Sequence, residues 1–153
     1  MSFQHPITIK KALDSIATHQ YVLPAIQREF VWRPEQICRL FDSLMRRYPI
    51  GSFLFWKVTP EKTREFRFYD FVLNYHQWLH PHCPPLTLNG DREVTAILDG
   101  QQRLTALNIG LRGSLAIKEP RRMWRNLKAY PVKLLHLNPV SYTHLTLPTT
   151  MLV

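Results

Sequence analysis

The stretch that decides the fold is EVTAILDGQQRLTALNIGLRG, residues 93–113. Its first part, from Val94 to Leu98, is a nearly continuous apolar run rich in β-forming residues, which predicts a strand buried on both faces. Asp99 and Gly100 interrupt this run, and after them apolar residues recur at helical spacing. The helical positions are Leu104, Leu107 and Leu111, with Ala106 and Ile109 widening the stripe. The stretch therefore predicts a strand, a tight turn and a helix.

The turn at Asp99 and Gly100 has the composition of a phosphate-binding turn. We expect Asp99 to be the N-cap of the helix, with Gln102 completing an Asp-x-x-Gln variant of the capping box. Gly100 has no Cβ, so a ligand can approach the backbone closely, and the free N–H groups of the first helical turn attract anions. Arg103 adds a guanidinium suited to bidentate phosphate binding, and the amides of Gln101 and Gln102 can orient a water molecule. The alternative is ordinary architecture, in which a capped helix follows a buried strand and the arginine is solvated.

A resemblance to a known family adds to this interpretation. ILDGQQRLTAL resembles the signature of the GmrSD-type restriction endonuclease N-terminal domain, a family related to the ParB/sulfiredoxin-like fold. A second block agrees, because YVLPAIQREFVW precedes an amphipathic helix and YPIGSFLFW, residues 48–56, follows it, in the order that the family shows. The resemblance extends over about residues 5–138. It implies an α/β (α+β) fold, a small mixed sheet flanked by helices.

The resemblance also implies a nucleotide-binding and NTP-hydrolysing module of a modification-dependent DNA restriction or antiphage system. Its nucleotide site would include Gly100 and Arg103, with Gln27 and Arg28 nearby. Arg103 would bind phosphate oxygens, Asp99 would cap the helix or hold a Mg²⁺-bound water, and a glutamine would orient the attacking water. The implied cofactors are an NTP, whose base the sequence does not specify, and Mg²⁺. The implied catalytic residues are Asp99, Gln101, Gln102 and Arg103.

Two alternatives to an NTP hydrolase remain open. The first is a non-catalytic ParB-like module, in which the nucleotide switches DNA binding. In the second, the DGQQR residues only hold the sheet and the helix together. In systems of this family, DNA cleavage usually belongs to a C-terminal HNH-type nuclease domain. The chain shows no His-Asn-His arrangement, so we expect that domain as a partner in cis or in trans.

The size and charge of the chain fit one domain that binds polyanions. Its 153 residues suffice for one domain, and a hydrophobic content of 45% is enough for a core. Lysine and arginine number 20 against 11 acidic residues, and the net charge of +9 favours nucleic acid, nucleotide phosphates or an anionic membrane surface. No signal peptide opens the chain and no apolar stretch has membrane-spanning length, so we expect a cytoplasmic location. Two cysteines, Cys38 and Cys83, indicate no disulfide framework.

The most basic part of the chain, residues 112–133, is the candidate DNA-binding face. It holds seven lysines and arginines against the single acid Glu119, with Trp124 and Tyr130 interleaved. Basic side chains neutralise backbone phosphates and aromatic rings stack on bases, although the composition fits a solvated linker equally well. The residues expected to bind DNA are Arg121, Arg122, Arg125 and Lys128.

The other segments supply the expected framework around this strand and helix. We expect helices over residues 9–17, 34–47 and 68–78, the first capped by Thr8. We expect strands over residues 21–24, 52–58 and 129–138, of which 52–58 is apolar enough to be internal.

A loop rich in histidine has a partial metal-ligand spacing, formed by His76, His80, His82 and Cys83. A zinc site is one interpretation of this spacing. The other is a surface loop with incidental histidines, and we expect this second one because no distant ligand pair completes a set.

The C-terminal segment differs from the rest. Residues 140–153 contain no charged side chain of Asp, Glu, Lys or Arg, and SYTHLTLPTT, residues 141–150, resembles a translated sequencing adapter. We therefore expect one domain over residues 1–139, incomplete at its C-terminal side, and a non-native or disordered tail over residues 140–153.

Overall fold

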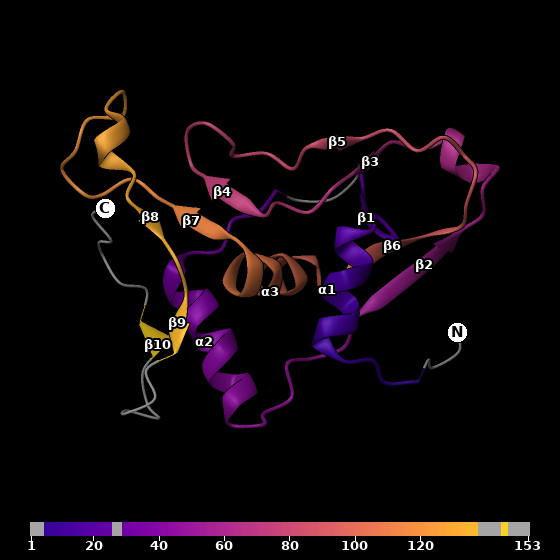
Figure 1. Ribbon diagram of the computed structural model, residues 1–153, viewed down its shortest axis with the longest axis horizontal. Helices are drawn as coiled ribbons and strands as arrows, with labels where there is room; N and C mark the ends of the chain where they lie inside the picture. Colours follow the sequence, from indigo (N-terminus) through magenta and orange to yellow (C-terminus); the bar gives the residue numbers. More distant parts are fainter. Residues whose placement is uncertain (1–4, 26–28, 138–144, 147–153) are drawn as a thin grey trace.

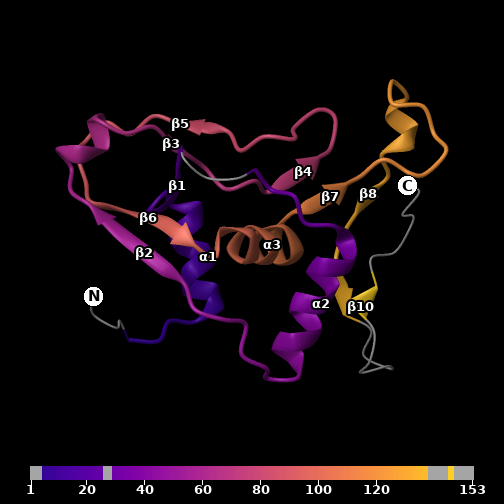
Figure 2. The same cartoon turned by 180° about the vertical axis from the view of Figure 1, so that it is seen from behind.

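The centre of the molecule is the helix α3, Gln101–Arg112, which lies between two mixed β-sheets (Figure 1 and Figure 2). The computed structural model describes residues 5–25, 29–137 and 145–146. Strand β6, Val94–Asp99, leads into α3 as the spacing in residues 93–113 predicts. The expected α/β class is confirmed, while the relation to the ParB/sulfiredoxin-like fold stays a prediction.

The larger sheet has five strands in the order β2-β6-β1-β3-β5. Strand β1, Tyr21–Pro24, runs parallel to β6, with Tyr21 opposite Thr95, and the other neighbours are antiparallel. Both parallel strands are rich in buried apolar residues, as is typical of strands covered on both faces. The other bounds are β2 Leu54–Val58, β3 Phe68–Tyr69 and β5 Pro85–Leu86.

Strand β2 is an edge strand, so the expectation that residues 52–58 form an internal strand is wrong. Leu54 and Lys57 are exposed, whereas Val58 is fully buried. Apolar composition alone does not distinguish an edge strand from an internal one, because Phe55 and Trp56 of β2 pack against core residues on opposite faces of the sheet although the strand lies at its edge.

The smaller sheet has three strands in the order β4-β7-β8 and lies on the other side of α3 (Figure 1). The pair β4 and β7 is parallel, and β7 and β8 are antiparallel. The expected strand over residues 129–138 is divided here into β8 and a second short strand, β9, which pairs with β10. The bounds are β4 Asn74–His76, β7 Ser114–Ala116, β8 Val132–Lys133, β9 His136–Leu137 and β10 Leu145–Thr146, with 3₁₀ turns η1 Lys62–Arg64 and η2 Leu127–Ala129.

Two amphipathic helices, α1 Ile9–Ala17 and α2 Pro34–Met45, complete the core as predicted. Thr8 caps α1, since its Oγ1 accepts a hydrogen bond from the Lys11 amide over 3.2 Å. Helix α2 approaches α3 closely at Gly110, where a Cβ would lie 2.5 Å from the ring of Phe41. The two longest helices, α2 and α3, have twelve residues each, and none of the described helices could cross a membrane.

Helix α3 is buried around most of its circumference, including the polar side chains of Thr105 and Asn108. Asn108 is paired, because its Nδ2 donates to the carbonyl oxygen of Val72 over 3.2 Å. A helix enclosed on all sides loses the clear amphipathic stripe of a surface helix. Its position fixes the turn at its N-terminus, where the candidate site lies.

Residues 68–78 do not form the expected helix. Phe68 and Tyr69 form β3, and Asn74–His76 form β4. The backbone bonds of this segment go to distant residues, for example from the Asp70 amide to the carbonyl oxygen of Pro84 over 2.9 Å. Aromatic residues favour strands, and here tertiary pairing overrides a spacing that also fits a helix.

The expected tail, residues 140–153, lies outside the described residues except for Leu145–Thr146. These two residues form β10, in which Leu145 is opposite Leu137.

Candidate functional site

Two connections leave the larger sheet at the same edge, because β1 and β6 are neighbouring parallel strands. The connection after β1 begins at Ala25, and the turn after β6 consists of Asp99 and Gly100. The N-terminus of α3 therefore lies at the edge where the chain also leaves β1.

Gln102, in the first turn of α3, joins these two connections. Its Nε2 donates to the carbonyl oxygen of Glu29 over 2.8 Å, and its Oε1 accepts from the amide of Val31 over 3.1 Å. Gln27 and Arg28 themselves lie outside the described residues. The residue directly after them is thus held against α3 by a side chain of the DGQQR motif.

The N-cap of α3 is Gly100, with a φ of 89°, and no side-chain hydrogen bond caps the helix within the described ranges. The expected capping role of Asp99 and its capping box with Gln102 is therefore wrong. The left-handed Gly100 turns the chain between β6 and α3, so that Asp99 is the last residue of β6 and Gln102 binds the connection after β1. Asp99 instead lies 3.3 Å from Nη2 of Arg103, and its side chain is 67% exposed.

Arg103 connects α3 to the segment that precedes β2. Its Nη1 donates to the carbonyl oxygen of Ile50 over 2.6 Å, and its Nη2 to that of Ser52 over 2.7 Å. The guanidinium also lies 4.6 Å from the ring centroid of Phe53, within cation–π range. We call these three contacts the Arg103 bridge. The side chain is 19% exposed, so it is not the solvated arginine of the ordinary interpretation.

Two glycines make room for the Arg103 bridge. Gly51 has a φ of 89°, and a Cβ there would lie 2.5 Å from Nη1 of Arg103. Gly100 also has a φ of 89°, and a Cβ there would lie 2.2 Å from the Phe53 ring. The ring of Phe53 thus occupies the space that a Cβ of residue 100 would need, and the close approach of a ligand to the Gly100 backbone stays a prediction.

Gln101 faces inward. Its side chain is buried, and its Nε2 donates to the carbonyl oxygen of Ile97 in β6. Gln101, Gln102 and Arg103 therefore all bind main-chain atoms of the domain. Of the polar side chains in this motif, Asp99 is the one that faces solvent.

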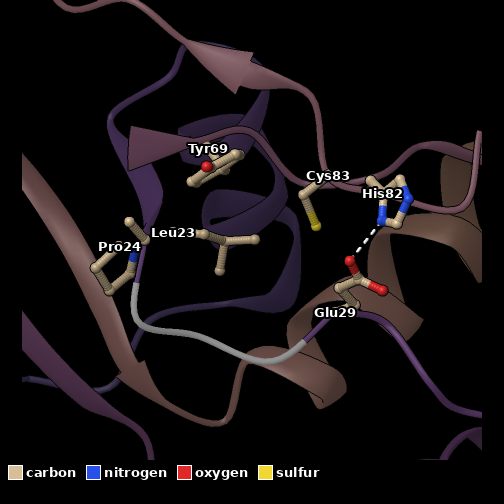
Figure 3. Close-up of a pocket in the computed structure, with 7 residues that line it drawn as sticks. Leu23, Pro24, Glu29, Tyr69, His82 and Cys83 are labelled. Atoms are coloured by element: carbon tan, nitrogen blue, oxygen red, sulfur yellow. Dashed lines mark hydrogen bonds and ion pairs between the residues drawn. The ribbon is translucent and has the colours of Figure 1, made fainter. Parts of the chain in front are cut away.

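A cavity of about 360 Å³ lies beside the end of β1 (Figure 3). Tyr69, Leu23 and Pro24 line one side, and Cys83 and the pair of His82 and Glu29 line the other (Figure 3). Nδ1 of His82 lies 2.5 Å from Oε1 of Glu29. Burial raises the pKa of the Cys83 thiol, which disfavours a reactive thiolate. Sequence reasoning missed this cavity, because β1 and residues 82–83 meet only in the folded chain.

Comparison with known proteins identifies the family. The sequence model described as the GmrSD restriction endonuclease, N-terminal domain, matches residues 9–144. The chain belongs to this family. An uncharacterized protein of Methanocaldococcus jannaschii is 35% identical over 99 residues, which are 65% of this chain and 15% of that protein. The chain thus spans a small part of the length of the relative that it matches.

The two sequence blocks that indicate a GmrSD N-terminal domain are joined by the Arg103 bridge. One block contains Ile50 and Ser52, and the other contains Arg103. The family match extends to residue 144, past the limit of about 138 expected from the motifs.

The histidine-rich loop of this GmrSD N-terminal domain does not gather its side chains. Nδ1 of His76 accepts from the amides of Trp78 and Leu79 over 3.2 and 3.1 Å, whereas His82 binds Glu29. Within the described ranges, no three His, Cys, Asp or Glu side chains are placed to hold a metal ion.

The expected DNA-binding residues of the GmrSD N-terminal domain lie in the connection between β7 and β8. Arg121, Arg122, Arg125 and Lys128 are all exposed there. Arg112, at the end of α3, serves the core instead, since its guanidinium binds the carbonyl oxygen of Leu13 and the carboxylate of Asp14. Trp78 follows β4, at the opposite edge of the smaller sheet from β8. Its ring centroid lies 5.9 Å from that of Tyr130, a proximity that no sequence signal indicated.

Proposed function

We propose that this domain is the nucleotide-binding and NTP-hydrolysing module of a modification-dependent DNA restriction system in the cytoplasm. The observation that carries the proposal is the sheet edge where the parallel strands β1 and β6 end beside the N-terminus of α3. In open α/β sheets, ligands bind outside the carboxyl ends of parallel strands, and helix N-termini attract phosphate. Among the described residues, no side-chain hydrogen bond caps α3 at its N-cap Gly100, which leaves its first N–H groups for a ligand.

The proposed roles follow from the geometry at this edge. Asp99 is suited to hold a water of Mg²⁺, because this ion binds through one or two carboxylates together with substrate phosphates and waters. Arg103 fixes the turn and adds positive charge, and it can contact phosphate oxygens where a bond of its bridge opens. Gln27 and Arg28 are proposed phosphate ligands, supported by the position of Glu29 against α3. Gln102 is the proposed positioning group for the attacking water.

The neighbouring cavity is the proposed site of the base. Its volume of about 360 Å³ lies within the range of small-molecule sites. Tyr69, Leu23 and Pro24 offer apolar contact, and Glu29 and His82 offer polar groups for the edge of a base.

DNA and an HNH-type nuclease domain, in cis or in trans, are the proposed partners. The family name describes a restriction endonuclease, and the described residues supply a basic face but no metal cluster of the kind a nuclease requires. We assign DNA cleavage to that other domain.

A ParB-like module that binds nucleotide without hydrolysing it is the second candidate. The observation that favours it is the engagement of Gln101 and Gln102 with main-chain atoms, because hydrogen bonds to the domain itself already hold each amide. Nucleotide would then switch DNA binding by shifting the population of two conformations.

The deciding experiment compares two matched variants in titration calorimetry and phosphate release, with ATP and GTP in the presence of Mg²⁺. Asp99→Asn removes an exposed carboxylate that pairs with an arginine four residues later. Asp42→Asn is the matched control, because it removes the exposed carboxylate of a second i,i+4 pair, in α2. Asp99→Asn should lower turnover by at least about tenfold, and Asp42→Asn should leave it unchanged.

The other outcomes of this experiment would support a different function for the domain. Nucleotide binding without phosphate release, together with DNA binding that weakens steeply with salt, identifies the ParB-like module. If neither nucleotide binds, the motif serves only to hold sheet and helix together.

A further inference from the structure

A surface of aromatic rings lies on the smaller sheet, away from the proposed nucleotide site. Tyr130 is buried at its centre, with Trp78 at 5.9 Å and Trp124 at 6.4 Å between ring centroids. The two tryptophans are 42% and 56% exposed. We call Trp78, Trp124 and Tyr130 the tryptophan surface. Trp124 and Tyr130 belong to the connection between β7 and β8, which projects from the molecule (Figure 1).

Side-chain hydrogen bonds hold the Tyr130 ring and the backbone that carries Trp124. The Tyr130 hydroxyl donates to the carbonyl oxygen of Trp124 over 3.0 Å. Nζ of Lys118 donates to the carbonyl oxygens of Glu119 and Arg122, each over 3.0 Å, and closes the connection on itself. Side chains fixed before a ligand arrives lose less conformational entropy when it binds.

The charge around the tryptophan surface is positive. Arg121, Arg125 and Lys128 are exposed, and within the described part of the chain no carboxylate lies within ion-pair distance of them. Glu119 is already paired with Arg122, at 3.5 Å from its Nε. Nζ of Lys118 lies 5.5 Å from the ring centroid of Trp124. Exposed indoles therefore lie among cations that have no acidic partner.

We propose that the tryptophan surface binds unpaired nucleotides of DNA, with its indoles stacking on bases and Arg121, Arg125 and Lys128 pairing with phosphates. Proteins that bind single strands combine these two elements, stacking rings and a cationic path for the backbone. The inference rests on the proposed function only in taking DNA as the partner.

The geometry favours unpaired nucleotides over a duplex. Base faces in a duplex are covered by neighbouring base pairs, so an indole reaches them only where a base is unstacked. A duplex is usually read by a helix or a strand pair in the major groove. The connection between β7 and β8 offers only the three-residue turn η2 among its described residues.

A protein surface is the other possible occupant, because the same connection exposes apolar side chains such as Met123 and Leu127. The unpaired charge argues against it, since the cores of protein interfaces are depleted of charged residues overall, and lysine, here Lys128, is rare there. Nucleic acid supplies the opposite charge in regular spacing.

The test is fluorescence polarisation of the whole chain with a fluorescein-labelled dT15 strand and with a labelled 15-base-pair duplex, without nucleotide. We expect dT15 to bind more tightly than the duplex. Trp124→Ala should weaken dT15 binding about 5- to 150-fold and leave its salt slope unchanged. Trp124→Phe should restore most of the affinity, because phenylalanine keeps a ring that stacks on a base.

Two further variants distinguish the contribution of stacking to dT15 binding from that of charge and from a general disturbance of the fold. Arg125→Gln should lower the salt slope for dT15 by about 0.7. Met123→Ala removes an exposed side chain of the same connection and should leave dT15 binding unchanged. Circular dichroism and thermal melting establish that each variant folds.

Three results would overturn the proposal. The first is a duplex that binds as tightly as dT15, and the second is dT15 binding that Trp124→Ala does not change. The third is self-association in sedimentation that Trp124→Ala abolishes while dT15 affinity stays the same, which assigns the surface to a protein contact. None of them affects nucleotide binding in calorimetry, so this proposal and the proposed function fail separately.

Discussion

The guanidinium of Arg103 donates to the carbonyl oxygen of Ile50 over 2.6 Å, although the two residues are 53 positions apart in the chain. This bond and the one to Ser52 join the two sequence blocks that indicate the GmrSD N-terminal family. Gly51 lies between the two carbonyl groups, in a left-handed conformation that turns both toward the arginine. The blocks therefore act as one structural unit, and changes in either should have a common effect.

Replacing Arg103 with alanine should lower the free energy of unfolding by roughly 2–4 kcal/mol. The variant loses two charge-assisted bonds and leaves the carbonyl groups of Ile50 and Ser52 without these donors. Arg103→Lys should recover less than half of the loss, since an ammonium cannot reproduce the planar fork. Urea unfolding measures the effect, with the exposed Arg39→Ala as the matched control. A loss below about 0.5 kcal/mol would be no more than that of a typical surface substitution. The Arg103 bridge would then not stabilise the fold.

Gly100→Ala should be destabilising for two separable reasons. A non-glycine residue at a φ of 89° is strained by roughly 1–2 kcal/mol, and the new Cβ would meet the Phe53 ring at 2.2 Å. Adding Phe53→Ala should remove the clash with the ring and leave only the backbone strain. The double variant should therefore lose less stability than the sum of the losses in the two single variants. Thermal unfolding of all four forms measures this coupling.

Gly90→Ala is the matched control for that cycle. Gly90 also has a positive φ, of 77°, but the nearest atom to a Cβ there, at 2.5 Å, belongs to the flexible side chain of Arg64, and the backbone oxygen of Pro60 lies at 3.2 Å. The cost should therefore be mainly conformational, without a clash as severe as the one with the Phe53 ring. Equal losses for Gly90→Ala and Gly100→Ala would show that Phe53 does not restrict the turn.

Local patterns in the sequence predict the elements of the core, and tertiary contacts decide the site. The periodicity after Gly100 predicts α3, and Thr8 predicts the start of α1. The spacing of aromatic residues in 68–78 fits a helix, but the segment pairs with β1 and β7 instead. The role of Arg103 depends on carbonyl groups about fifty positions away, which no local pattern reveals.

Replacing Gln102 with alanine should release the connection after β1 without unfolding the domain. The amide of Val31 donates to Oε1 of Gln102, so its hydrogen exchange should accelerate at least about tenfold by local opening. Gln36→Ala is the matched control, because Gln36 accepts from the amide of Arg33 in the same way at the start of α2. Exchange at Val31 should respond only to the first change, and exchange at Arg33 only to the second. Unchanged exchange at Val31 would mean that another contact holds the connection.

The smaller sheet should lose stability in acid through His76. Desolvation and the charge of His80 lower the pKa of His76 below 6.5, its usual value. A histidine with a lowered folded pKa favours the neutral form in the native state, so its contribution is complete above about pH 6.5 and declines as the pH falls toward the lowered value. Protonation of Nδ1 also removes the acceptor for the amides of Trp78 and Leu79. The free energy of unfolding should therefore be lower at pH 5 than at pH 7.

His76→Asn isolates this effect, because an asparagine oxygen can accept the same amide bonds at both pH values. The variant should show a smaller decrease in unfolding free energy between pH 7 and pH 5 than the parent chain, as measured by urea titration. His5→Asn is the control, because it changes an exposed histidine near the N-terminus. This variant should show the same decrease in unfolding free energy between pH 7 and pH 5 as the parent chain. An NMR titration of His76 with a midpoint at or above pH 6.5 would contradict the assignment, since neither desolvation nor His80 would then govern its proton.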